Sequence, residues 1–256
     1  MALVTWDTHE DIATVTLRRS DKLNSLNAEM IAELGHALTA AADVSRVVVL
    51  RAEPGVSVFS AGHDLADVPV GQADPHTWDN PVEELIAGVG HLPVPVIAAV
   101  EGTVWGAACN LVVACDLIVA CDNVSFAITP AKLGVPYFGA GVSIMARSLP
   151  LHVVRAMFFT AEPLSAVDAH RFGMVTAVVP DEATLTTTVQ RLATRISRLA
   201  PLTMQAVKSE LAALDPHAPD TAAEREAFRR AAWLSADVQE GVSAFRERRH
   251  PEFRGQ

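Results

Sequence analysis

Three short, uninterrupted apolar runs constrain the fold of this chain most strongly. They read VVVL, VIAAV and LIVA, and they occupy residues 47–50, 96–100 and 117–120. Runs in which every residue is apolar are typical of strands buried on both faces, as in a parallel sheet. A helical pattern after Asn27 precedes the first run, and two more lie between the runs: one over 81–91, and one rich in small residues from near Gly106. The alternation predicts an α/β core built on a parallel sheet.

The segments around these runs complete the expected organisation. Residues 4–6 and 12–17 predict a hairpin, and Asn27 is a suitable cap for a helix that reaches about Ala42, with one apolar face. A loop rich in glycine and acidic residues is expected over 53–80, and a short strand over 124–126. From Leu151 onward the pattern is helical. The expected helices are 151–159, 165–171, 182–199, 201–214, 221–234 and 236–248, with one strand at 175–179.

The length and patterning predict one large core with a helical appendage. We expect residues 1–200 to form the core that carries the substrate site, and residues 201–256 to form a C-terminal helical region.

Charge and composition exclude several classes of function. The chain has 20 Lys and Arg against 30 Asp and Glu, so it lacks the cationic excess that a general nucleic-acid binder uses. Its first residues lack the pattern of a signal peptide, and Glu101 and Asp116 interrupt the longest apolar stretch. We therefore expect a cytoplasmic protein with no membrane partner. Three cysteines are expected to be buried thiols in a reducing cytosol: Cys109, Cys115 and Cys121.

Two glycine-containing segments carry the candidate chemistry. Residues 58–65 read VFSAGHDL, and residues 100–110 read VEGTVWGAACN. In each, a strand runs into small residues, an arrangement that lets backbone N–H groups point at a ligand instead of a sheet partner. The second segment also begins a helix, whose first N–H groups and dipole favour negative charge. Either segment alone is a common turn, but two such donors converging on one oxygen form an oxyanion hole.

These two segments and SFAITPAKLGVPY at 125–137, in this order, resemble the crotonase (enoyl-CoA hydratase/isomerase) superfamily. The resemblance covers essentially the whole chain, including KLNSL at 22–26 and AFRERRHPEF at 244–253. It implies an α/β spiral fold of ββα units with a helical C-terminal trimerisation region. It also implies an acyl-CoA thioester as substrate and self-association as a trimer or hexamer.

The resemblance also assigns site residues by position. The oxyanion donors would be the backbone N–H groups of His63 and Ala107. Arg248 would meet the CoA phosphates, often from a neighbouring subunit. Coenzyme A is here part of the substrate, so no separate cofactor and no metal are expected. The remaining CoA-binding positions would be Lys22, Leu23, Ala61, His63, Asp64 and Leu65.

Two departures from the superfamily pattern narrow the reaction. Hydratases of this superfamily use two glutamates, and their positions hold Asn110 and Pro130 here. Neither residue can act as a general base, so hydration by the usual route is not expected. Decarboxylation needs no base, because a 2-carboxyacyl thioester carries its own leaving group and the enzyme has only to orient it and stabilise the enolate.

Further segments resemble bacterial methylmalonyl-CoA decarboxylases, which turn methylmalonyl-CoA into propionyl-CoA. They are TPAKLGVPY at 129–137, VWG at 104–106 together with His63, the loop at 73–81, and MFFTA at 157–161. In those enzymes a glutamate usually stands where this chain has Asn110. The expected activity is that of a carboxy-lyase.

The roles of single side chains remain open at this point. Tyr137 could orient the carboxylate or protonate the enolate, or be a buried phenol with a satisfied hydroxyl. Asn110 could bond the carboxylate or cap a helical turn, and Thr129 could donate to substrate or bond a strand end. Two other functions also remain: a different enolate-forming reaction, such as isomerisation or thioester hydrolysis, and a non-catalytic acyl-CoA-binding homologue.

Overall fold

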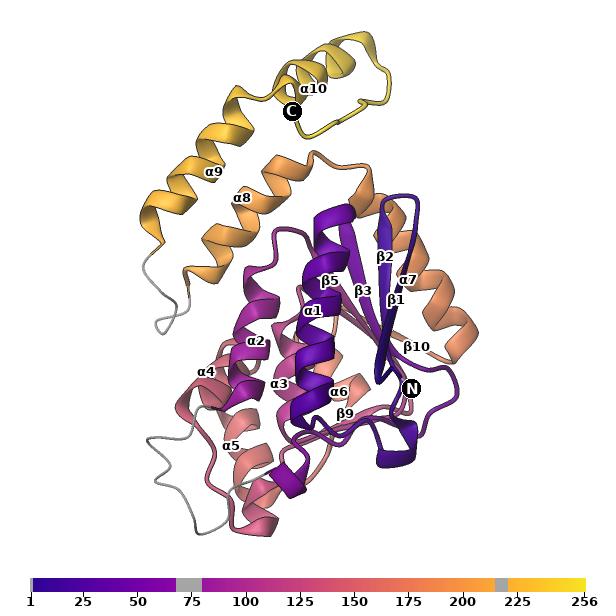
Figure 1. Ribbon diagram of the computed structural model, residues 1–256, viewed down its shortest axis with the longest axis vertical. Helices are drawn as coiled ribbons and strands as arrows, with labels where there is room; N and C mark the ends of the chain where they lie inside the picture. Colours follow the sequence, from indigo (N-terminus) through magenta and orange to yellow (C-terminus); the bar gives the residue numbers. More distant parts are fainter. Residues whose placement is uncertain (1, 68–79, 215–220) are drawn as a thin grey trace.

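Two sheets form the centre of the molecule (Figure 1). The computed structural model describes residues 2–67, 80–214 and 221–256. The larger sheet has six strands in the order β1-β2-β3-β5-β7-β10, and the smaller has four in the order β4-β6-β8-β9. The larger sheet comprises β1 (Val4–His9), β2 (Ile12–Leu17), β3 (Val47–Ala52), β5 (Val96–Val100), β7 (Leu117–Cys121) and β10 (Ala177–Val179). The smaller comprises β4 (Val58–Ser60), β6 (Thr103–Trp105), β8 (Ser125–Ala127) and β9 (Leu164–Ser165).

The strand order confirms the predicted α/β fold of ββα units. β1 and β2 form the predicted antiparallel hairpin, and β2, β3, β5, β7 and β10 are parallel neighbours. Successive strand pairs divide between the sheets: β3, β5 and β7 join the larger one, and β4, β6 and β8 join the smaller one. The three uninterrupted apolar runs are β3, β5 and β7, and their apolar residues are buried nearly throughout.

The helices surround these sheets. The helices in the described residues are α1 (Ala28–Val44), α2 (Pro81–His91), α3 (Ala107–Ala114), α4 (Gly139–Ser148), α5 (Leu151–Thr160), α6 (Ala166–Arg171), α7 (Glu182–Ser197), α8 (Pro201–Ala212), α9 (Ala222–Leu234) and α10 (Ala236–Glu247). As predicted, Asn27 caps α1 by accepting a hydrogen bond from the Met30 N–H at 3.0 Å. α1 packs on β1 and β2, whereas α7 packs on β3, β5 and β7.

A partly buried ion pair joins α8 to the core. Lys208 of α8 is 6% exposed, and its Nζ lies 2.7 Å from Asp116 Oδ2 and 2.9 Å from the Val94 carbonyl. Asp116 also accepts the Val96 N–H at 2.7 Å, so it caps the start of β5. Further out, α9 and α10 lie beyond α8 at one end of the molecule (Figure 1). Their exposed apolar side chains include Trp233 and Phe245, which are 77% and 86% exposed.

Several short elements escaped prediction. α4 contains Gly139 and Gly141 and has no side-chain cap, and β6 and β9 are too short to show a period. The expected loop over 53–80 includes strand β4 and a short 3-10 helix, η2 (Leu65–Asp67). The strand expected over 175–179 begins only at Ala177, because Val175 still belongs to the turn after α6. Two more 3-10 helices are η1 (Ser20–Lys22) and η3 (Pro130–Leu133).

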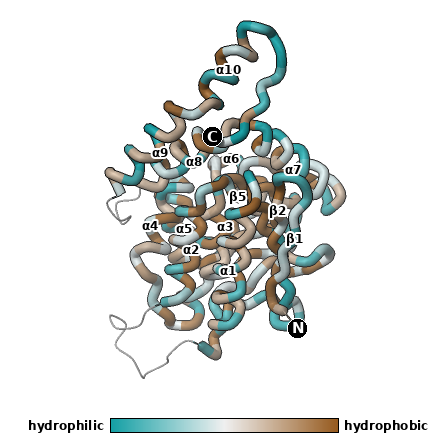
Figure 2. The backbone as a smooth tube through the Cα atoms, turned by 45° about the horizontal axis from the view of Figure 1, so that its top comes forward, coloured by the Kyte–Doolittle hydropathy of each residue, from teal (hydrophilic) through white to brown (hydrophobic). Residues whose placement is uncertain are grey.

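Apolar residues gather in the interior, around β2 and β5, while the loop after α10 is hydrophilic (Figure 2). The three cysteines are buried there as predicted. Burial raises the pKa of the Cys109 and Cys115 thiols to about 12 and that of Cys121 to about 11. Of the helices in the described ranges, none combines the length and apolar character needed to cross a bilayer.

Candidate active site

A cavity of about 770 Å³ is lined by the segment after β4, by α2, by α3 and by the stretch from Thr129 to Ser148, and α8 lies at its far end. All five residues predicted to be catalytic line it: His63, Ala107, Asn110, Thr129 and Tyr137. They come from three separate stretches of chain, which the two-sheet arrangement brings to one place. Its lining is mainly apolar, so charges inside it are poorly screened.

The two predicted oxyanion segments touch through their backbones. Gly62 has φ +82°, and a Cβ there would lie 2.5 Å from the Trp105 carbonyl oxygen and 2.9 Å from the Ala107 nitrogen. Only glycine fits such an approach, because a side chain would occupy the space of the neighbouring backbone. The residues that follow, His63 and Ala107, are therefore brought to one side of the cavity, as an oxyanion hole requires.

His63 is held in an isolated parallel bridge to Leu26. The bridge uses the Gly62 carbonyl, which accepts the Leu26 N–H at 2.8 Å, and the Asp64 N–H, which donates to the Leu26 carbonyl at 3.0 Å. The N–H of His63 consequently points to the opposite side of the strand. Desolvation lowers the pKa of the imidazole, against the opposing field of Asp67 and Asp64, so the ring is mainly neutral at pH 7.

Ala107 is the first residue of α3, and its N–H has no acceptor within the helix. The turn before it is fixed by Gly106, which has φ 55° and donates its own N–H to the Ala127 carbonyl at 2.8 Å. The positive end of the helix dipole adds to the attraction for an oxyanion at this point. The arrangement agrees with the role predicted for the Ala107 N–H.

Asn110 and Tyr137 form a pair on the cavity wall. The Tyr137 hydroxyl donates a short hydrogen bond to Asn110 Oδ1, and Asn110 Nδ2 donates to the Gly141 carbonyl at 2.8 Å. Asn110 is 1% exposed, and the Tyr137 ring packs edge-on against Phe158 at 5.0 Å between centroids. Burial raises the pKa of the phenol far above its usual value, so Tyr137 stays protonated. Asn110 therefore anchors Tyr137 and α4.

Thr129 and Pro130 lie where the chain enters η3. Thr129 precedes this 3-10 helix without making a side-chain cap, and its carbonyl accepts the Lys132 N–H at 2.9 Å. Pro130 lines the cavity at the position of a hydratase glutamate, and it presents only a hydrocarbon ring. Thr129 belongs to the cavity lining.

The predicted CoA-binding residues are only partly brought together. Ala61, Asp64 and Leu65 line the cavity beside His63. Lys22 and Leu23 lie outside it, although the Leu23 carbonyl accepts the Ala61 N–H at 2.9 Å, and Leu23 lines a separate hollow of about 530 Å³. Arg248 ends α10 and is not part of the cavity lining, so one chain alone does not carry it to the site.

Sequence reasoning missed a carboxylate in the cavity, that of Glu83. Glu83, in the first turn of α2, lines the wall together with Tyr137. In residues 2–67, 80–214 and 221–256 no hydrogen bond or ion pair engages its carboxylate, and desolvation raises its pKa. An acidic residue three positions after the cap Asn80 fits any helix start, so nothing in the sequence signalled a place in the cavity. Of the loop at 73–81 that entered the resemblance, 73–79 lie outside the described residues.

Comparison with known proteins agrees with this geometry. The enoyl-CoA hydratase/isomerase family model matches residues 7–256. Methylmalonyl-CoA decarboxylase of Escherichia coli K12 is 37% identical over 95% of both chains, and 1,2-epoxyphenylacetyl-CoA isomerase of the same strain is 31% identical over 95% of both. A solved structure of methylmalonyl-CoA decarboxylase in complex with 2-nitronate-propionyl-CoA has a TM-score of 0.81 and 35% identity, with 99% of both chains covered. The chain therefore belongs to the enoyl-CoA hydratase/isomerase family.

Proposed function

We propose that this protein is a carboxy-lyase that decarboxylates a 2-carboxyacyl-CoA thioester, turning methylmalonyl-CoA into propionyl-CoA. The observation that carries the proposal is the state of the two positions that hold glutamates in hydratases. Asn110 is buried and hydrogen-bonded to Tyr137 and Gly141, and Pro130 is a hydrocarbon on the cavity lining. A reaction that needs a base at these positions is disfavoured, whereas a substrate that supplies its own electron pair is not affected.

The proposed reaction follows from the oxyanion hole. The bond between C2 and the carboxylate breaks, its electron pair moves into the thioester to give an enolate, and carbon dioxide leaves. The N–H groups of His63 and Ala107 stabilise the enolate oxygen, and one such donor is worth about 3–4 kcal/mol of barrier. The apolar cavity lining favours loss of the charged carboxylate, because it removes the water that stabilises that charge.

Protonation of the enolate completes the cycle. C2 must receive a proton to become propionyl-CoA. Tyr137 remains protonated at neutral pH and lies beside Asn110 on that wall, so we propose it as the donor. The phenolate left behind would be stabilised by the amide of Asn110 after rotation of that side chain, and it would recover its proton from water.

The relatives support this substrate class. Methylmalonyl-CoA decarboxylase and 1,2-epoxyphenylacetyl-CoA isomerase act, by their names, on CoA thioesters, and the matched structure is a complex with 2-nitronate-propionyl-CoA. The C-terminal helices expose apolar side chains such as Trp233 and Phe245, which supports self-association as a trimer or hexamer. In such an assembly a neighbouring subunit would supply Arg248 to the CoA phosphates.

Two substrates test the proposal. The protein is incubated with methylmalonyl-CoA, and propionyl-CoA and carbon dioxide are followed by mass spectrometry, in parallel with hydration of crotonyl-CoA. We expect propionyl-CoA to form and hydration to stay far below the typical enzyme turnover of about 10 s⁻¹. Rapid hydration of crotonyl-CoA without decarboxylation would contradict the proposal, and turnover of neither would favour a non-catalytic acyl-CoA-binding homologue.

Glu83 supports a second candidate function. A desolvated carboxylate in the cavity could serve as the base for another enolate-forming reaction, such as isomerisation of an enoyl-CoA or hydrolysis of a thioester. Glu83→Gln separates the two, with Glu84→Gln as control, because Glu84 belongs to the same helical turn but is exposed. Decarboxylation should survive Glu83→Gln, whereas a base-dependent reaction should fall by about 10²-fold or more.

A further inference from the structure

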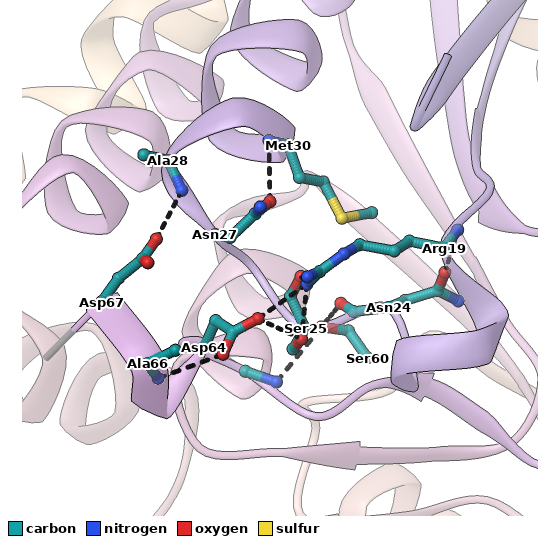
Figure 3. Close-up of polar contacts among 11 residues, drawn as sticks. Arg19, Asn24, Ser25, Asn27, Ala28, Met30, Ser60, Asp64, Ala66 and Asp67 are labelled. Carbon is teal, nitrogen blue, oxygen red and sulfur yellow. Dashed lines mark hydrogen bonds and ion pairs between the residues drawn. The ribbon is translucent and has the colours of Figure 1, made fainter. Parts of the chain in front are cut away.

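We propose that Arg19 and Asp64 are positioning residues of the active site, whose ion pair holds the peptide of His63 in place as an oxyanion donor. The proposal rests on the oxyanion hole proposed above. Asp64 directly follows His63, and Arg19 lies in the turn after β2, far from it in sequence. Figure 3 shows the two side chains meeting between the turn at 19–26 and the segment that carries the hole.

The two side chains of the ion pair make several further hydrogen bonds and are largely shielded from solvent. Arg19 Nη1 lies 2.8 Å from Asp64 Oδ2, and it also donates to the Ser25 hydroxyl at 2.7 Å and to the Ser25 carbonyl at 2.8 Å. The Ser25 hydroxyl donates to the same carboxylate oxygen at 3.0 Å, while Asp64 Oδ1 accepts the Ala66 N–H at 3.2 Å. The side chains of Arg19 and Asp64 are 15% and 20% exposed. Such a pair is screened by salt less than a surface pair.

Main-chain hydrogen bonds tie the same two segments on both sides of His63. Before it, Gly62 accepts the Leu26 N–H, and after it, the Asp64 N–H donates to the Leu26 carbonyl. One residue earlier, the Ala61 N–H donates to Leu23 at 2.9 Å. These main-chain hydrogen bonds hold the peptide of His63 at Gly62 and at Asp64, and the Arg19–Asp64 pair stabilises the position of Asp64. A rotation of that peptide would move its N–H away from the Ala107 N–H.

The turn at 19–26, which is hydrogen-bonded to the segment around His63, has a strained backbone. Leu23 and Asn24 are consecutive residues with φ 55° and 49°, in the left-handed region that non-glycine residues seldom adopt. The buried Asn24 side chain supports this turn, because its amide donates to the Phe59 carbonyl at 2.9 Å and its Oδ1 accepts the Arg19 N–H at 2.8 Å. Strain of this kind persists where surrounding contacts over-determine it, often beside functional sites.

The geometry also alters the role expected for Asp64. As a CoA-binding residue it would offer a carboxylate to the substrate, but both of its oxygens already accept hydrogen bonds from this network. The bond from Arg19 lowers the pKa of the carboxyl, so the charge that the pair needs is present at neutral pH. Asp64 therefore acts through the backbone of its neighbour, not by contact with the acyl group.

The test reads the polarisation of a bound thioester carbonyl. The protein binds propionyl-CoA carrying ¹³C at the thioester carbon, and difference infrared spectroscopy records the carbonyl stretch, which an oxyanion hole moves to lower frequency. The variants are Arg19→Met, Arg19→Lys and Asp64→Asn. Arg18→Met is the control, because Arg18 makes an ion pair with Glu53 at a similar distance, 2.9 Å, that is more exposed and lies away from the hole. Calorimetry with propionyl-CoA measures binding of each variant.

We expect Arg19→Met and Asp64→Asn to bind propionyl-CoA nearly as well as wild type and to lose most of the carbonyl shift, with kcat reduced about 10-fold or more. Arg19→Lys should recover part of the shift, since lysine keeps the charge but not the forked geometry. A full shift in Arg19→Met and Asp64→Asn would overturn the proposal, as would an equal loss in Arg18→Met. Absence of the shift in wild type would refute the oxyanion hole and the positioning role together. A normal shift without release of carbon dioxide would refute only the decarboxylase function.

Discussion

Replacing Gly62 by alanine should separate the two halves of the proposed oxyanion hole. A Cβ at this position would lie 2.5 Å from the Trp105 oxygen, 2.9 Å from the Ala107 nitrogen and 3.4 Å from the Ala108 nitrogen. Non-bonded carbon contacts are normally about 3.5–4.0 Å, so one segment must retreat by about 1 Å. These neighbours are backbone atoms, which cannot rotate out of the way as a flexible side chain does. The Ala107 N–H would move away from the substrate oxygen.

Two effects contribute to the cost, and a control variant separates them. Gly62 has φ +82°, a conformation that costs a residue with a Cβ about 1–2 kcal/mol. Gly55 also has φ +82°, but no atom of the described residues lies within 4 Å of a Cβ built there. Gly55→Ala should therefore show the backbone cost alone, and Gly62→Ala should lose about 1–3 kcal/mol more through overpacking. Each kcal/mol corresponds to about 2–4 °C in Tm for a chain of this size.

The displacement should also lower the rate of the reaction. A displacement of about 1 Å in a catalytic group can lower the rate about 10²-fold, so we expect that loss in kcat for Gly62→Ala while KM changes little. Thermal unfolding and steady-state kinetics with methylmalonyl-CoA, run on both variants well below Tm, measure the two quantities. If Gly62→Ala matches Gly55→Ala in both Tm and kcat, the close approach of the two segments does not shape the site.

Three further predictions concern single groups, and a fourth concerns the oligomeric state. Ala107→Pro removes one oxyanion donor at a helix start that tolerates proline, so kcat should fall about 10²–10³-fold. His63→Ala keeps its backbone N–H, so its loss in kcat should be far smaller. Equal kinetics for Ala107→Pro and wild type would make the donor assignment wrong. Tyr137→Phe keeps the ring but removes the hydroxyl, and an unchanged rate of propionyl-CoA formation would exclude its role as proton donor. The rate of decarboxylation should be independent of pH between about 7 and 9. Burial lowers the pKa of His63 and raises that of Tyr137, so both side chains are neutral throughout this range. A bell-shaped pH profile in this range would contradict that protonation state. Light scattering at micromolar concentration should show a trimer or hexamer, and a monomer would count against packing of subunits through the C-terminal helices.

The fold could be predicted where local patterns were strong. The apolar runs of β3, β5 and β7 identified parallel strands, and Pro81 after Asn80 marked the start of α2 correctly. α4 was missed because its glycines weaken helical propensity and its stability comes from tertiary contacts, including the bond from Asn110 to Gly141. The short strands β6 and β9 exist only as partners of neighbouring strands, which no local pattern reveals.

For the candidate site, too, the sequence identified residues but not the contacts between them. Family resemblance pointed to the residues that line the cavity, including Asn110 and Tyr137, but not to the hydrogen bond between them, which joins residues 27 positions apart. Arg19 was missed for a similar reason, because its partner Asp64 is 45 positions away and the sequence shows only an arginine after a strand. Glu83 matched a common helix start, so its place in the cavity depended on how α2 packs. Contacts between distant segments carry most of what the sequence did not reveal.

Different parts of the chain form the two ends of the cavity. Lys208, Leu211 and Ala212 of α8 close the end opposite the proposed oxyanion donors, and the ion pair of Lys208 with Asp116 holds that helix against the ends of the core strands. The groups proposed for bond breaking all precede residue 140, whereas this end of the space comes from residues after 200. Substitutions of Leu211 and Ala212 would therefore change the cavity wall without replacing any group proposed for bond breaking.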